Sequence, residues 1–409
     1  MSFIYSALLG VYYFLILIAS PFNVKARNWI QGRKGLLNKL EKVCLGNEKI
    51  VWFHSASLGE FEQGRPVIEE LKKQRPELKI LLTFFSPSGF EIRKNYKGAD
   101  YIYYLPMDFK HNAKRFIDII NPVAAYFIKY EFWHNYLNEL KRRQIPVYCF
   151  SSNFRPDQLF FKRYGGWYRQ VLYCFTHLYV QNQKSKDLLE KIGLKNVTVS
   201  GDTRFDRVFQ IASQAKQLPA IEKFKNNFQV IIAGSTWPAD EDLLVSYINQ
   251  SELRCKFIIA PHELHSSNIE KLVSSISKKV IKYSETGQLR PEEYDVLIID
   301  NIGMLSSVYQ YGNVAYIGGG FGKGIHNILE AATFGLPIVF GSNFEKFQEA
   351  HDLVKNKGAY TISSFGQFKK IFDMLLSNTG TLQASSLVCK SYVADNTGST
   401  NKILSDIHF

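Results

Sequence analysis

Short apolar runs alternate along the chain with longer amphipathic stretches, a pattern typical of a parallel sheet with helical connections. In the first half, the predicted strands are Lys49–His54, Lys79–Phe85, Tyr101–Leu105, Ala124–Ile128, Val147–Ser151, Leu178–Gln181 and Val197–Ser200. Helical stretches such as Phe61–Lys73, Asn112–Ile120 and Trp133–Arg143 lie between them. This half is therefore predicted to be a Rossmann-like, doubly wound α/β domain.

The second half repeats this alternation without a close sequence repeat. Its predicted strands are Val230–Ala233, Lys256–Ile259, Val296–Ile299, Val314–Ile317 and Ile338–Phe340. A polar, loosely helical stretch that contains Pro219 separates the halves. We expect a membrane anchor at 1–24, a first domain at 25–206, a linker at 207–227 and a second Rossmann-like domain at 228–409. Ligands of such domains bind beyond the carboxyl ends of the strands, here in a cleft between the two domains.

The segment 314–341 is the strongest local signal in the second half. A strand-like run ends at Gly318–Gly320, and His326 and Asn327 then open a short helical segment. Free backbone N–H groups at such a turn can bind a phosphate. The segment is not a P-loop, because no Gly-Lys-Ser/Thr closes it. A purely structural alternative is a tight turn with a capping box formed by Asn327 and Glu330.

Two carboxylates follow predicted strands of the first half. Glu60 closes the segment His54-Ser-Ala-Ser-Leu-Gly-Glu60, in which Ser57 and Gly59 also face the predicted ligand edge. Glu131 follows its strand almost directly, where a glutamate is costly unless it is exposed or paired. Glu60 can act as a general base in the cleft, and Glu131 is a further candidate for a functional role. The structural alternative for Glu60 is stabilisation of a helix N-terminus.

Further polar residues follow strands of the second half. Ser235 and Thr236 supply hydroxyl groups after one strand, and His262 and Glu263 follow the next. His262 and His265 lack a partner at helical spacing, so we predict no metal site. The residues expected to bind substrate or nucleotide are Ser57, Gly59, Ser235, Thr236, His262, Gly319, Gly320, Gly324, His326, Asn327 and Glu330.

The N-terminus is apolar and carries no charge from Ser2 to Val24. This is just long enough to cross a bilayer, which takes about 20 helical residues. The seven basic residues that follow favour a cytoplasmic location for the rest of the chain; they are Lys25, Arg27, Arg33, Lys34, Lys39, Lys42 and Lys49. The alternative is a helix that packs on the first domain or lies on the membrane without crossing it.

Composition narrows the class of partner. The 409 residues carry a formal net charge of +13, which suits nucleic acid, an anionic membrane or a phosphorylated substrate. Nucleic acid ranks low because no zinc-ligand spacing or helix-turn-helix pattern is present. The five cysteines are odd in number and far apart, which favours a reducing compartment over a disulfide framework.

Five motifs together resemble those of 3-deoxy-D-manno-octulosonic acid (Kdo) transferases, glycosyltransferases of the GT-B fold. They stand in the family's order: His54–Glu60, Lys129–Asn135, Gly201–Asp206, Ala233–Trp237 and Gly318–Glu330. The resemblance implies transfer of Kdo from CMP-Kdo to a lipid A precursor of lipopolysaccharide, with inversion and without a cofactor. It implies that Glu60 is the catalytic base, that Glu131 is essential, and that the loop Gly318–Glu330 holds CMP.

Two positions depart from the family pattern. Pro261-His262-Glu263 stands where the family commonly has a proline-arginine pair, and Met304 stands where it has an acid. The resemblance further implies an enzyme at the cytoplasmic side of the inner membrane. The alternatives are a GT-B enzyme that uses a UDP-sugar and a lipid acceptor, and a membrane-associated scaffold without catalysis.

Overall fold

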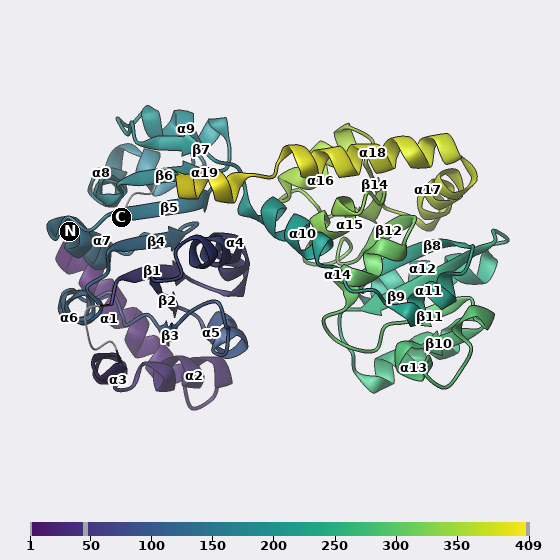
Figure 1. Ribbon diagram of the computed structural model, residues 1–409, viewed down its shortest axis with the longest axis horizontal. Helices are drawn as coiled ribbons and strands as arrows, with labels where there is room; N and C mark the ends of the chain where they lie inside the picture. Colours follow the sequence, from purple (N-terminus) through teal and green to yellow (C-terminus); the bar gives the residue numbers. More distant parts are fainter. Residues whose placement is uncertain (1, 44–47, 406–409) are drawn as a thin grey trace. The chain divides into compact units, whose positions relative to one another are not determined.

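The computed structural model describes residues 2–43 and 48–405, which form two compact α/β units. Unit 1 comprises Met1–Arg207 together with Thr397–Phe409, and unit 2 comprises Val208–Asn396. Figure 1 shows that each unit has a central sheet with helices on both faces. The predicted fold class of two doubly wound parallel sheets is confirmed.

The sheet of unit 1 is parallel throughout, in the order β3-β2-β1-β4-β5-β6-β7. Its strands are β1 (Ile50–Ser55), β2 (Lys79–Phe84), β3 (Tyr101–Tyr104), β4 (Ala124–Ile128), β5 (Val147–Ser152), β6 (His177–Val180) and β7 (Val197–Val199). Both faces are buried, which explains the continuous apolar runs. In β1, Trp52 packs into one core while Val51 and Phe53 pack into the other.

Helices cover both faces of this sheet. The core that contains Trp52 receives side chains from α3, α6, α7 and α9, and the opposite core receives them from α4 and α19. The α-helices of this unit are α1 (Ser2–Ala19), α2 (Val24–Arg33), α3 (Leu36–Val43), α4 (Leu58–Gln74), α5 (Pro87–Arg93), α6 (Lys110–Ile120), α7 (His134–Arg142), α8 (Gly166–Arg169), α9 (Gln183–Glu190) and α19 (Ser399–Ser405), while α10 (Thr203–Ser213) continues into unit 2.

The C-terminal end of the chain returns to unit 1, whereas the sequence predicts it in the second domain. Asp206 accepts hydrogen bonds from the backbone N–H groups of Gly398 and Thr400, both at 2.6 Å, and so holds the start of α19. Ile403 and Leu404 are then buried in the core beside α4. The return is stabilised by contacts nearly 200 residues apart in sequence, which local patterns do not encode.

The sheet of unit 2 is also parallel, in the order β10-β11-β9-β8-β12-β13-β14. Its strands are β8 (Gln229–Thr236), β9 (Cys255–Pro261), β10 (Val280–Lys282), β11 (Val296–Ile298), β12 (Val314–Ile317), β13 (Ile338–Gly341) and β14 (Ala359–Ile362). The predicted linker 207–227 contains the end of α10 and all of α11. The α-helices that follow α10 are α11 (Pro219–Lys225), α12 (Pro238–Gln250), α13 (Ser266–Ser275), α14 (Leu305–Val308), α15 (Leu329–Thr333), α16 (Gln348–Lys355), α17 (Phe365–Ser377) and α18 (Thr379–Asp395).

Helix α1 packs on unit 1 along one side. The Tyr5 hydroxyl donates to Asp108 at 2.7 Å, and the Tyr12 ring stacks on Phe85 at 6.3 Å. The other side exposes large apolar side chains, among them Ile4, Leu8, Val11, Phe14, Leu15 and Ile18. Within the described ranges, no helix has the length and apolar character needed to cross a membrane, so the predicted anchor is not confirmed.

Candidate active site

Glu60 and Glu131 follow β1 and β4, which are neighbouring parallel strands, so both lie at the same edge of the sheet of unit 1. Glu60 is half-buried in the first turn of α4, and the hydroxyl of Ser57, the residue before this helix, donates to its carboxylate. A carboxylate at this end of a helix is stabilised by the helix dipole. The structure therefore gives Glu60 a fixed position at the predicted ligand edge.

A chain of hydrogen bonds holds Glu131. Its Oε2 accepts from Trp133 Nε1 at 2.8 Å and lies 3.1 Å from Nε2 of the fully buried His54. Nδ1 of His54 lies 2.8 Å from the Thr83 hydroxyl, which accepts in turn from Trp52 Nε1 at 2.8 Å. These contacts link two neighbouring strands, β1 and β2, to one carboxylate.

The two indole groups fix the direction of two of these hydrogen bonds. An indole N–H can only donate, so the Thr83 hydroxyl accepts from Trp52 and Glu131 Oε2 accepts from Trp133. The Thr83 hydroxyl also lies 3.3 Å from Phe53 O, and His54 Nε2 also lies 3.1 Å from Trp133 Nε1. Either tautomer of His54 completes this network.

The backbone is strained at the same edges of the two sheets. Lys129, two residues before Glu131, has φ 71°, Ser151 at the end of β5 has φ 56°, and Ser235 in β8 has φ 53°. Non-glycine residues rarely adopt such angles, and they tend to cluster at functional sites.

In unit 2, close backbone contacts require glycine in the loop after β12. A Cβ on Gly318 would lie 2.2 Å from the carbonyl oxygen of Ser235, and a Cβ on Gly320 would lie 2.5 Å from the nitrogen of Gly341. Gly319 has φ 91°, which favours glycine at that position as well. The ends of β8, β12 and β13 therefore meet at a surface made of backbone.

A buried carboxylate supports this loop from below. Asp240 is 1% exposed and accepts from the Gly319 backbone N–H at 2.9 Å, the Trp237 backbone N–H at 3.0 Å and the Tyr316 hydroxyl at 2.7 Å. These three donors compensate for the desolvation of Asp240. The carboxylate belongs to the scaffold of the loop and faces the protein interior.

Three rings stack beside the glycine loop. His262 lies between Trp237 and His326, with ring centroids 4.6 Å and 4.5 Å away. Trp237 Nε1 donates to His326 Nε2 at 2.9 Å. Burial, with a smaller contribution from His262, lowers the pKa of His326, which suits an imidazole that accepts this hydrogen bond.

Known proteins resemble this chain in sequence over both units. The model of the family "3-Deoxy-D-manno-octulosonic-acid transferase (kdotransferase)" matches residues 29–207. The Kdo transferase of Rickettsia bellii is 26% identical over 386 residues, covering 90% of this chain and 91% of the relative. That of Aquifex aeolicus is 26% identical over 324 residues, covering 78% and 82%. The chain is similar to Kdo transferases over most of its length. Like these relatives, it is a glycosyltransferase.

More distant proteins share this fold. The UDP-GlcNAc 2-epimerase of Neisseria meningitidis, solved with UDP-GlcNAc bound, superposes with a TM-score of 0.62 at 15% identity. The match covers 87% of this chain and 98% of the epimerase. At this identity the likeness concerns the fold alone, which is two parallel-sheet α/β domains of the GT-B kind.

The structure brings several of the predicted site residues together. Thr236 precedes Trp237 of the ring stack, and the Gly324 carbonyl oxygen lies close to Gly319. Asn327 Nδ2 donates to Glu330 Oε1 at 3.0 Å, and Asn327 Oδ1 accepts from the backbone N–H of Leu329 at 3.1 Å.

Helix α15 begins at Leu329, so Asn327 precedes the capping position by one residue and the predicted capping box is shifted. Gly59 is exposed next to Glu60.

Several residues of these edges were not singled out from sequence. They are His54, Thr83, Trp133, Trp237 and Asp240. His54 and Trp133 stand inside the motifs that contain Glu60 and Glu131. Their place in these motifs could have marked them as candidate site residues. Asp240 offered none, because an acid in the first turn of a helix is ordinary on a surface.

Proposed function

We propose that this protein transfers Kdo from CMP-Kdo to a lipid A precursor, with inversion and without a metal or cofactor. The observation that carries the proposal is the pair of carboxylates at one sheet edge, Glu60 at a helix start and Glu131 held by His54 and Trp133. The names of the relatives supply the sugar.

In the proposed reaction, Glu60 takes the proton from the attacking hydroxyl of the acceptor. The acceptor oxygen forms a bond to the anomeric carbon of Kdo on the face opposite the phosphate. The bond between that carbon and the phosphate oxygen breaks, and its electron pair leaves with CMP. Glu131 is proposed to orient the acceptor, since its Oε2 is engaged by Trp133 and its position is fixed by His54.

The glycine loop of unit 2 is proposed to hold CMP. Support comes from the backbone surface at Gly318–Gly320 and from the neighbouring imidazoles of His262 and His326. Further residues proposed to contact the donor are Ser235, Thr236, Gly324, Asn327 and Glu330. Gly319→Val should abolish CMP binding measured by calorimetry. Unchanged binding would show that the loop does not hold CMP.

Helix α1 is proposed to attach the protein to the cytoplasmic side of the inner membrane by lying on its surface. The support is its apolar side, where Leu8 is 64% exposed and Leu15 is 58% exposed. Replacing both by glutamine should lower co-sedimentation with vesicles. Leu387→Gln on α18, where the leucine is 66% exposed, is the control and should change nothing. Equal binding by all forms would contradict the attachment.

The decisive experiment is incubation of the purified protein with CMP-Kdo and a lipid A precursor, with the products identified by mass. A mass increase of one or more Kdo residues supports the proposal. Turnover only with a UDP-sugar would favour the alternative GT-B enzyme. Binding of membranes with no turnover of either donor would favour a scaffold.

A further inference from the structure

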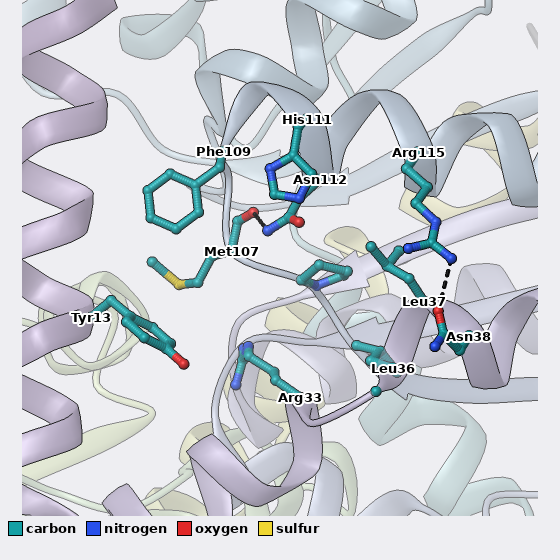
Figure 2. Close-up of a pocket in the computed structure, with 12 residues that line it drawn as sticks. Tyr13, Arg33, Leu36, Leu37, Asn38, Met107, Phe109, His111, Asn112 and Arg115 are labelled. Carbon is teal, nitrogen blue, oxygen red and sulfur yellow. Dashed lines mark hydrogen bonds between the residues drawn. The ribbon is translucent and has the colours of Figure 1, made fainter.

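A cavity of about 380 Å³ lies in unit 1, and neither Glu60 nor Glu131 lines it. It is formed by the end of α2, the start of α3, the start of α6 and Tyr13 of α1. Figure 2 shows Arg33 and Tyr13 on one side of it, and His111, Asn112 and Arg115 on the side of α6. None of these residues has a part in the proposed transfer.

Arg33 is a half-buried cation that is held in place by the backbone. Its Nε donates to Leu105 O at 2.8 Å, Nη1 to Trp29 O at 3.1 Å and Nη2 to Phe85 O at 2.7 Å. The guanidinium carbon lies 3.8 Å from the centroid of the Trp29 ring. These contacts fix the guanidinium and use three of its five N–H donors.

No ion pair of Arg33 occurs in the parts of the chain that the structure describes. Burial lowers the pKa of Arg33 to about 9, which reflects the cost of holding this charge without a carboxylate. Aromatic rings and carbonyl oxygens offset part of that cost. An anion in the cavity would offset more of it, and two N–H groups remain to bind one.

Helix α6 adds to the positive potential of the cavity. His111 and Asn112 lie in its first turn, which contains no acidic residue and has no side-chain cap. Arg115, one turn further on, donates to Asn38 Oδ1 at 2.8 Å and to Glu41 Oε2 at 2.9 Å. The side chains of Arg115 and Glu41 are both exposed. Breaking this ion pair therefore costs little free energy.

The apolar side chains of α1 next to the cavity indicate what kind of molecule would carry the anion. Tyr13 lines the cavity from α1, and Leu17, one helical turn further along, is 44% exposed. The cavity thus adjoins the helix that exposes a row of large apolar side chains. An anion that arrives on an apolar molecule at a membrane surface matches both features.

We propose that this cavity binds the phosphate of an anionic lipid headgroup, with Arg33 as a fixed two-pronged donor and Arg115 as a second cation. The inference rests on the proposed function only in placing the chain at a lipid surface. It assigns a second lipid contact, which involves neither Glu60 nor Glu131.

The test uses the full-length protein and vesicles of phosphatidylcholine with or without phosphatidylglycerol. Arg33→Lys keeps the charge and loses the fork geometry, so it should weaken binding to the anionic vesicles by roughly tenfold or more. A purely nonspecific attraction would leave Arg33→Lys unchanged. Circular dichroism and the unfolding midpoint check that this variant remains folded.

Two matched substitutions on α6 provide a second test that leaves Arg33 unchanged. Arg115→Ala and Lys114→Ala each remove one exposed positive charge, and only Arg115 lines the cavity. Loss of one charge near an anionic surface costs about fivefold in either case. Arg115→Ala should lose clearly more, and equal losses would overturn the proposal.

Calorimetry separates a lipid headgroup from a free anion. Glycerol phosphate, a soluble headgroup analogue, and inorganic phosphate are titrated into the protein and into Arg33→Lys. Arginine-dependent binding of the analogue and of vesicles supports the proposal, and binding of inorganic phosphate alone overturns it. A protein that transfers Kdo but shows no arginine-dependent vesicle binding would contradict this inference alone. The reverse result would contradict the proposed function alone.

Discussion

The two sheets present different chemistry at corresponding edges. Unit 1 offers two carboxylates held by neighbouring side chains, Glu60 by Ser57, and Glu131 by His54 and Trp133. Unit 2 offers backbone and rings, and its carboxylate Asp240 is turned inward under the glycine loop. The same fold thus suits proton transfer on one unit and the binding of an anion on the other.

The largest expected effect tests the role of unit 1. Glu60→Gln should keep the fold and CMP binding, because the change is nearly isosteric, and should lower kcat by about 10²–10⁴-fold. Glu70→Gln, on the same helix α4, is the matched control and should leave kcat unchanged. If kcat of Glu60→Gln is near that of the unmodified protein, Glu60 is not the catalytic base.

A pair of glycines tests the backbone surface of unit 2. In Gly320→Ala the new Cβ would lie 2.5 Å from Gly341 N, so the ends of β12 and β13 must separate. Overpacking of this kind costs about 1–3 kcal/mol of stability and should also weaken CMP binding. In Gly322→Ala the nearest atom is 3.7 Å away, so stability should change little. Thermal unfolding and calorimetry of both variants check the difference.

The support of Glu131 is tested by Trp133→Phe. The substitution keeps an aromatic ring beside Phe85, whose centroid lies 4.8 Å from that of Trp133. It removes the N–H group that donates to Glu131. A hydrogen bond to a charged group contributes about 1.5–3 kcal/mol, so kcat should fall by roughly 10- to 100-fold if Glu131 acts in the transition state. A rise in KM with unchanged kcat would show that Glu131 contributes to acceptor binding only.

The sequence predicted the strands of both units well, since strands buried on both faces are apolar along their whole length. The edge strands β10 and β14 escaped prediction, because three or four residues with mixed burial leave no clear pattern. The position of Glu131 was predictable from its place after β4. Its support was not, because His54 is 77 residues away and reaches it only through the order of the sheet.

The N-terminal helix shows a similar limit. Its apolar residues predict contact with a membrane. The structure shows what two of its tyrosines do: Tyr5 bonds Asp108 and Tyr12 stacks on Phe85, so one side of α1 is occupied by unit 1. Hydropathy cannot separate the packed side from the exposed side when both are apolar.

The smallest expected effect concerns pH, and its sign differs between the units. Burial raises the pKa of Asp108 in unit 1 to about 7, against the opposing effect of its hydrogen bonds from Tyr5, Asn135 and Tyr136. The folded state then binds more protons than the unfolded state between about pH 4 and 7. The contribution of Asp108 to stability therefore falls as the pH rises through this window.

His326 in unit 2 acts in the opposite direction. Burial lowers its pKa, so below about pH 6.5 the unfolded state binds more protons and the contribution of His326 falls as the pH drops. Hydrogen exchange, corrected for intrinsic rates, can follow peptides of each unit between about pH 5 and 7. Acidification should increase protection near the start of α7, which contacts Asp108, and decrease it near the end of β12. Asp108→Asn should flatten the first trend alone and His326→Gln the second alone, whereas parallel trends in both units would show that other groups control the response.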